Sequence, residues 1–253
     1  MNKTRLILGK SIPLSEGFEV KQPTMEEISL MDEGLFDSYL TPFVLTIDAL
    51  FENEEEAENI RSKHTIFQLF FHKIDESKYL LDSVVGGRNS LEFLKEAIAF
   101  FLDIDESKIT ILKHRKRFAV SDGDRELIID DGMYDKLRKV IQFITSREDV
   151  EVERPPKNMT DRQKDIWLKL QKGRKRREQR EAITMADMIN IVALGGRSHI
   201  PFNEITKMTY YQFRRAYASI IARDNFELSM GYKLSQKFDV KDEVRHWSKD
   251  FKV

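Results

Sequence analysis

Three short groups of residues have types and spacings that could do chemistry. The Gly-Gly-Arg sequences at 86–88 and 195–197 could bind phosphate, because glycines leave backbone amides accessible and arginine offers two parallel donors. Asp122-Gly123-Asp124 resembles part of a calcium loop but lacks the remaining ligands. Ordinary helix ends and turns explain all three better, and neither glycine sequence has a Rossmann or P-loop spacing.

The other residues with catalytic potential form no recognisable constellation. Five histidines are scattered along the chain without the spacing of zinc ligands, although His64 and His72 could face the same side of one helix. The remaining three are His114, His199 and His246. There is no cysteine and no Gly-x-Ser-x-Gly elbow, and no carboxylate pair stands out as acid and base. We therefore predict a protein that is not an enzyme, with no catalytic residue, metal or cofactor.

Charge is distributed very unevenly along the chain. Residues 154–180 contain eleven Lys/Arg against three Asp/Glu, whereas residues 15–60 contain thirteen Asp/Glu against one Lys. The net charge of -1 therefore conceals two regions of opposite sign. Such asymmetry indicates what a protein contacts more than how it folds.

The basic region, centred on a helix expected over 169–180, has three interpretations. It can contact the phosphates of a nucleic acid, it can meet an acidic protein surface, or it can be a solvated helix face. The acidic surface includes this protein's own Glu52–Glu58 region, in the same chain or in a second copy. The charged residues predicted to bind protein are Glu54, Glu55, Glu56, Arg174, Lys175, Arg176 and Arg177.

Composition and length limit the class of protein. With 253 residues, 41% hydrophobic and 34% charged, the chain is long enough for one large or two smaller globular domains. The absence of cysteine fits a reducing compartment. No apolar run is long enough for a signal peptide or a membrane span, so we expect a protein that does not contact the membrane.

The N-terminal part mixes helical and strand patterns. Residues 5–20 are expected to be extended, and Thr24 with Glu27 should cap a helix that continues through Tyr39. One helix is expected over residues 54–73 and another after Asn89. Three strands are then predicted at 109–112, 117–120 and 126–129, followed by a helix from about residue 130.

The character of the sequence changes near residue 150. Residues 151–158 contain two prolines and few apolar side chains, which is typical of a linker. Beyond them every segment looks helical, with capping-box spacings at Thr160/Gln163 and Thr209/Gln212. We predict an α+β fold, with a mixed N-terminal domain (1–150), a linker (151–158) and a helical C-terminal domain (159–253).

The C-terminal half contains short motifs that suggest a family. Residues 208–213 (Met-Thr-Tyr-Tyr-Gln-Phe), 223–226 (Arg-Asp-Asn-Phe) and 244–247 (Val-Arg-His-Trp) resemble tail assembly chaperone proteins of phages that infect Gram-positive bacteria. The resemblance is clearest over residues 150–253. It implies a non-enzymatic protein of the host cell cytoplasm that binds the tape measure protein before the tail tube polymerises around it.

The resemblance also suggests which residues make contacts. Tyr210, Phe213 and Tyr217 are candidates for client binding, although ordinary core packing explains their helical spacing too. Opposite charge on the two regions would favour head-to-tail self-association of many copies along an elongated client. The alternative function is a nucleic-acid-associated phage protein that uses the basic helix of residues 169–180.

Overall fold

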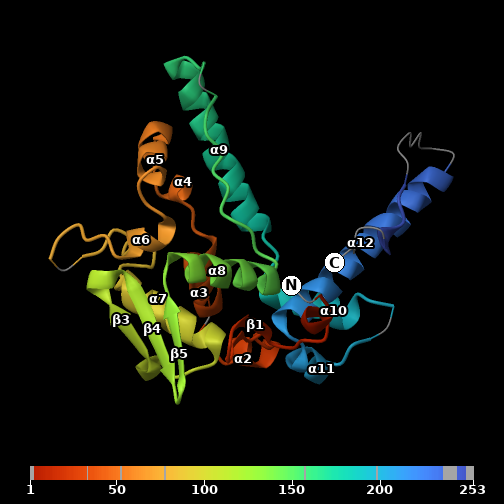
Figure 1. Cartoon of the computed structure of the whole chain (residues 1–253). Helices are drawn as coiled ribbons and strands as arrows, with labels where there is room; N and C mark the ends of the chain where they lie inside the picture. Colours follow the sequence, from red (N-terminus) through yellow and green to blue (C-terminus); the bar gives the residue numbers. More distant parts are fainter. Residues whose placement is uncertain are drawn as a thin grey trace.

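The computed structural model describes residues 3–32, 34–51, 53–76, 78–156, 158–197, 199–235 and 244–248. Helices and short antiparallel strands occupy the N-terminal half and helices the C-terminal half, which confirms the predicted α+β class (Figure 1). The elements up to residue 145 are α1 (Lys3–Ile7), β1 (Ile12–Ser15), β2 (Phe18–Val20), α2 (Met25–Ser29), α3 (Leu35–Val44), α4 (Ile47–Leu50), α5 (Glu54–Arg61), α6 (Ile66–Phe70), α7 (Ser90–Leu102), η1 (Glu106–Lys108), β3 (Ile109–Leu112), η2 (Lys113–Arg115), β4 (Arg117–Asp122), β5 (Arg125–Ile129) and α8 (Asp131–Thr145). Those that follow are α9 (Asp161–Glu181), α10 (Met185–Leu194), α11 (Phe202–Lys207) and α12 (Tyr210–Leu234).

A three-stranded antiparallel sheet, in the order β3-β4-β5, packs against α7 and α8. Its register pairs Phe118 with Ile129 and Val120 with Leu127, and all four side chains are buried. Alternate residues along each strand point to the same face, so one face joins the core and the other meets solvent. The three predicted strands are confirmed, and Asp122-Gly123-Asp124 is the β4–β5 turn.

The helices beside the sheet begin at the predicted caps. The Asn89 side chain accepts hydrogen bonds from the amides of Leu91 and Glu92, both at 3.1 Å, and so starts α7. The inward face of α7 is buried as expected, from Leu91 to Phe101. On α8 the Tyr134 hydroxyl donates to the carbonyl of Pro42 at 2.7 Å, which joins α8 to α3. Burial raises the pKa of Tyr134, so this hydroxyl remains a donor.

The C-terminal helices pack onto the N-terminal half through two helix starts. The Tyr210 amide donates to the carbonyl of Pro23 at 2.7 Å, and the Met25 amide donates to the carbonyl of Met208 at 2.9 Å. Thr24 and Thr209, which cap α2 and α12, form an isolated antiparallel bridge between them. Buried residues of α10, α11 and α12 belong to the same hydrophobic core as those of α7 and α8. The division into domains 1–150 and 159–253 stays a prediction.

One expected strand is a helix. Residues 12–15 and 18–20 are extended as predicted, but Lys3–Ile7 forms α1. The helix ends in a local turn at Gly9 (φ 69°), where the Gly9 amide donates to the Leu6 carbonyl at 3.1 Å and the Lys10 amide donates to the Arg5 carbonyl at 2.8 Å. The buried Gln22 amide adds hydrogen bonds to the carbonyls of Leu6 at 3.1 Å and Lys10 at 2.8 Å, and so joins this turn to the segment after β2.

Two helices predicted as continuous are interrupted. The segment from Thr24 to Tyr39 divides into α2 and α3 because Gly34 adopts a left-handed conformation (φ 80°) before α3. The segment 54–73 divides into α5 and α6, since the Thr65 side chain accepts from the Gln68 amide at 3.3 Å and starts a new helix. Residues 80–87, which precede α7, form turns without a helix.

Two helices extend beyond the compact body, the name used below for the elements that share the hydrophobic core, from α1 to α8 together with α10, α11 and the first half of α12. In Figure 1, α9 extends away from the body with the chain that precedes it running alongside, and the distal half of α12 projects in a different direction. The preceding segment, residues 151–156, has neither helix nor strand and is held to α4 by an ion pair between Arg154 and Asp48 at 3.0 Å. The confirmed Thr160/Gln163 capping box starts α9.

Candidate functional site

The predicted acidic residues form the first turn of α5. Glu54, Glu55 and Glu56 are exposed there, where negative charge interacts favourably with the helix dipole. The Asn53 side chain caps this turn by accepting from the Glu55 amide at 2.9 Å. The dipole alone explains three carboxylates at this position, and their contact with a partner stays a prediction.

The predicted basic residues form the C-terminal half of α9. Arg174, Lys175, Arg176 and Arg177 are all exposed. Consecutive helical residues are rotated by about 100° from one another, so the four charges point in several directions. The acidic turn and the basic segment thus belong to separate elements, α5 and α9. Their association, within one chain or between copies, remains a prediction.

The three predicted aromatic residues lie on the part of α12 that packs on the body. Tyr210 and Phe213 are fully buried, and the Tyr210 ring lies 5.0 Å from that of Phe36. Tyr217 is half-buried at the edge of the core. Direct client contact by Tyr210 or Phe213 would require the core to open, whereas Tyr217 is partly accessible in this fold.

Exposed apolar residues on α9 were missed by the sequence reasoning. Ile166, Leu168 and Leu170 are 50%, 56% and 60% exposed, and Ile166 and Leu170 lie one turn apart on the same side. On a neighbouring side, Gln171 donates to the carboxylate of Glu153 in the linker. The sequence signal for this surface is the apolar run Ile-Trp-Leu-Lys-Leu at residues 166–170, inside a helix that is otherwise charged.

The projecting half of α12 has the same character. Leu228 and Tyr232, one turn apart, and the terminal Leu234 are exposed. Phe226, on another side of the helix, contacts His246 with ring centroids 5.0 Å apart. Both projecting helices therefore present unburied aliphatic side chains on elements that leave the body (Figure 1).

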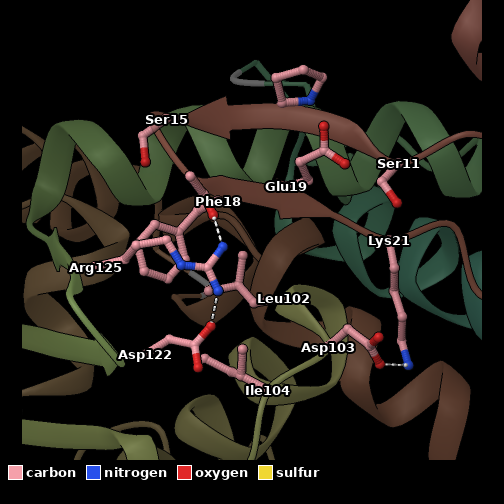
Figure 2. Close-up of a pocket in the computed structure, with 12 residues that line it drawn as sticks. Ser11, Ser15, Phe18, Glu19, Lys21, Leu102, Asp103, Ile104, Asp122 and Arg125 are labelled. Atoms are coloured by element: carbon pink, nitrogen blue, oxygen red, sulfur yellow. Dashed lines mark hydrogen bonds and ion pairs between the residues drawn. The ribbon is translucent and has the colours of Figure 1, made fainter.

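A polar hollow of ≈ 540 Å³ lies between the β1–β2 hairpin, the end of α7 and the β4–β5 turn. Figure 2 shows Arg125 reaching across it, where the guanidinium donates to the Gly17 carbonyl at 2.7 Å and to the carboxylate of Asp122. On the other side, Lys21 donates to Asp103 at 2.9 Å. A second bond joins Lys21 to Glu27, also at 2.9 Å.

The electrostatics of this hollow indicate structural ion pairs. Burial by itself lowers the pKa of Lys21, but its hydrogen bonds to Glu27 and Asp103 outweigh burial and raise it. The hydrogen bond from Lys108 holds the pKa of Asp122 below its usual value. The residues lining the hollow include neither a histidine nor a cysteine. These contacts fasten the hairpin to α7 and the sheet.

Both Gly-Gly-Arg arginines are engaged within the protein. Arg88 forms two hydrogen bonds with the Glu96 carboxylate at 2.6 and 2.7 Å, and Arg197 pairs with Glu227 at 2.5 Å. Gly195 is the C-cap of α10. The rings of His64 and His72 are 6.2 Å apart, but within the described ranges no three His, Asp or Glu side chains gather as a metal site.

One comparison connects the C-terminal helices to a known domain. Residues 175–252 match the family model of the YomV second domain, a span that includes the basic end of α9 together with α10, α11 and α12. This match, over about a third of the chain, indicates a phage-associated domain family. No curated protein and no solved structure matches the chain. Within the described residues, no helix combines the length and apolar character needed to span a bilayer.

Proposed function

We propose that this protein is a non-enzymatic bacteriophage assembly protein that binds a long helical client, and that the client is the tape measure protein of the tail. The phage-associated domain match and the resemblance of residues 208–213 to tail assembly chaperones support this assignment. The observation that carries it is the pair of projecting helices with exposed apolar side chains, Ile166 and Leu170 on α9 and Leu228 and Tyr232 on α12.

The energetics of α9 favour a partner. Isolated helices are marginally stable in water, and most helices in proteins gain stability by packing an apolar face. In α9, which is 21 residues long, Ile166, Leu168 and Leu170 are at least half exposed. Burying each remaining aliphatic surface would contribute about 1 kcal/mol, roughly half the value of a full side chain. An amphipathic client helix laid against the side that carries Ile166 and Leu170 would gain this energy at those two residues, because Leu168 lies about 200° away around the helix.

Charge defines the client more closely. Beside the apolar residues, α9 exposes cations from Lys172 to Arg177, so a client helix with acidic residues next to its apolar stripe is the better match. Many copies could bind along an elongated client, and contacts between the acidic turn of α5 and the basic segment of α9 would order them head to tail. We place this step in the host cell cytoplasm.

Co-expression with the candidate tape measure protein tests the proposal. We expect the two proteins to co-purify, and the double substitution I166D/L170D to reduce recovery of the client at least tenfold, because both charges would lie in the contact. The control is L30D/I74D, which makes the same kind of change at two other exposed apolar residues, both in the N-terminal half. Failure of the wild-type protein to co-purify, or equal recovery with I166D/L170D, would contradict the proposal.

The second candidate function is nucleic-acid binding by the basic segment of α9. The observation that favours it is the cluster of exposed cations, Lys172 and Arg174–Arg177. Phosphate contacts predict that binding to duplex or single-stranded DNA weakens steeply with salt, whereas an apolar client contact does not. Tight, strongly salt-dependent DNA binding that is lost in R174Q/R176Q would favour this alternative.

A further inference from the structure

We propose that a second hollow, between α8 and α12, binds an acidic peptide segment of a partner protein that also carries an apolar side chain. The hollow has a volume of ≈ 550 Å³ and is lined by the C-terminal end of α8 and the first two turns of α12. It lies away from the apolar residues of the projecting helices that carry the proposed function. The site therefore adds a second binding surface to the protein.

The lining is predominantly cationic. Lys139, Arg147 and Arg215 contribute three positive charges and Glu148 one negative charge. Lys139 pairs with Asp135 at 2.6 Å and Arg147 with Asp37 at 2.7 Å, and all four of these side chains are exposed. Exposed ion pairs contribute little net stability, so incoming carboxylates can replace Asp135 and Asp37 at low cost.

The third cation is positioned by the wall of the hollow. The Arg215 guanidinium donates to the Tyr211 hydroxyl at 3.2 Å and lies 5.8 Å from the centre of the Tyr211 ring. These contacts restrict the rotamers of a long side chain before a ligand arrives. The Arg215 cation thus adds positive charge to this wall of the hollow.

An apolar surface lies among the charges. The Phe143 ring is parallel to that of Tyr211, with centroids 6.5 Å apart and an interplanar angle of 14°. Tyr211 is buried, but Phe143 remains 39% exposed and lines the hollow. A ligand that offers carboxylates alone would leave the exposed Phe143 ring in contact with water. An acidic segment with an aliphatic or aromatic residue would cover it.

The same features favour a peptide over a nucleic acid. Proteins bind single strands with successive open aromatic faces along a basic groove. Here Tyr211 is buried, so of the two aromatic residues that line the hollow only Phe143 is accessible for stacking.

Fluorescence anisotropy with a labelled peptide of alternating glutamate and leucine tests the site on the full chain. We expect the peptide to bind more tightly than polyglutamate, because only the former covers Phe143. The substitution K139E/R147E should weaken peptide binding about tenfold, as two attractive contacts become repulsive. The control K63E/K78E makes the same change in net charge at two exposed lysines outside the hollow and should change binding less than twofold.

Further variants and competitors distinguish the possible ligands of the hollow, and they distinguish this proposal from the proposed function. F143S should remove the preference for the leucine-containing peptide, and I166D/L170D on α9 should leave peptide binding unchanged. Absence of peptide binding, or equal binding by K139E/R147E, would overturn the inference. So would oligothymidylate displacing the peptide at lower concentration, which would assign the hollow to nucleic acid. A dimer of this chain that the peptide dissociates would assign it to a second copy.

Discussion

A helix of the compact body and a projecting helix begin with the same capping box, but the two helices are stabilised differently. Thr209 caps α12 inside the body, where its hydroxyl also lies 3.3 Å from the buried Gln22 amide oxygen. Thr160 caps α9 with an equivalent capping box, yet the side chains that follow remain largely exposed. A capping box thus sets where a helix begins, whereas tertiary packing determines how much that helix contributes to stability.

The largest expected effect is a loss of global stability caused by a substitution in the core of the body. Phe213 on α12 is fully buried in the core that α7 and α8 share. We expect F213A to lower the free energy of unfolding by about 3–5 kcal/mol, because it removes an aromatic side chain and leaves a cavity. L228A, on the projecting half of the same helix, should stay within about 0.5 kcal/mol. Urea unfolding followed by circular dichroism measures both.

The shape of the urea unfolding transition shows whether the C-terminal helices unfold together with the N-terminal half. Because residues of α12 belong to the same core as α7 and α8, F213A should move the whole transition rather than one part of it. A separate early transition that leaves the N-terminal half folded would show that the C-terminal helices form an independent unit.

An intermediate effect compares the two caps directly. T209A removes the side chain that accepts from the Gln212 amide at 3.3 Å, and we expect a loss of about 1–2 kcal/mol in global stability. T160A removes the equivalent bond to Gln163 at 3.4 Å, and we expect a global change below about 0.5 kcal/mol. Hydrogen exchange should instead speed up only in the first turns of α9. Equal global losses for the two variants would contradict the distinction between body and projection.

The smallest expected effect is a pH dependence confined to the body. Burial alone raises the pKa of Glu27, but the hydrogen bond from the Thr24 amide and the pairing with Lys21 outweigh burial and lower it. A carboxyl whose pKa is lowered on folding stabilises the protein above its ordinary value of 4.5, and this contribution is lost as the pH falls through the folded pKa.

The variant E27Q isolates this contribution. It keeps an acceptor for the capping box but removes the charge, so its stability should fall less than that of the wild type between about pH 5 and pH 3. The change should be a fraction of a kcal/mol, because Glu27 is well solvated. In α9 the neutral Gln163 occupies the equivalent position and should give no such dependence. Urea midpoints at several pH values check this, and parallel curves for E27Q and wild type would contradict it.

Much of the fold could be predicted where the signal is local. The Thr24/Glu27 spacing identified the start of α2, Asn89 the start of α7, and Asp122-Gly123-Asp124 the β4–β5 turn. Each depends on neighbours within a few residues. The capping box of Thr184 with Asp187 was missed because the expected partner at that position was Glu or Gln.

The rest depends on contacts between distant residues. No local pattern could show that Gln22 would bond to the carbonyl of Leu6, although Gly9, which ends α1 in a left-handed turn, is a local signal that was overlooked when Lys3–Ile7 was expected to be extended. Periodicity placed Tyr210 and Phe213 on one face but could not say whether the core or a client would cover it. The α8–α12 hollow likewise joins Arg147 to Arg215 from separate parts of the chain. Sequence reasoning therefore identified candidate residues more readily than the surfaces they form.

The junction between the two helix starts has a consequence for synthesis of the chain. Gln22 and Thr209, which meet there, are 187 positions apart in the sequence. While the ribosome is still translating the second half, the nascent N-terminal half already displays Phe36 without the ring of Tyr210 that later covers it. The last stage of folding must therefore await the synthesis of α12, and until then the nascent chain exposes apolar surface that this helix later covers.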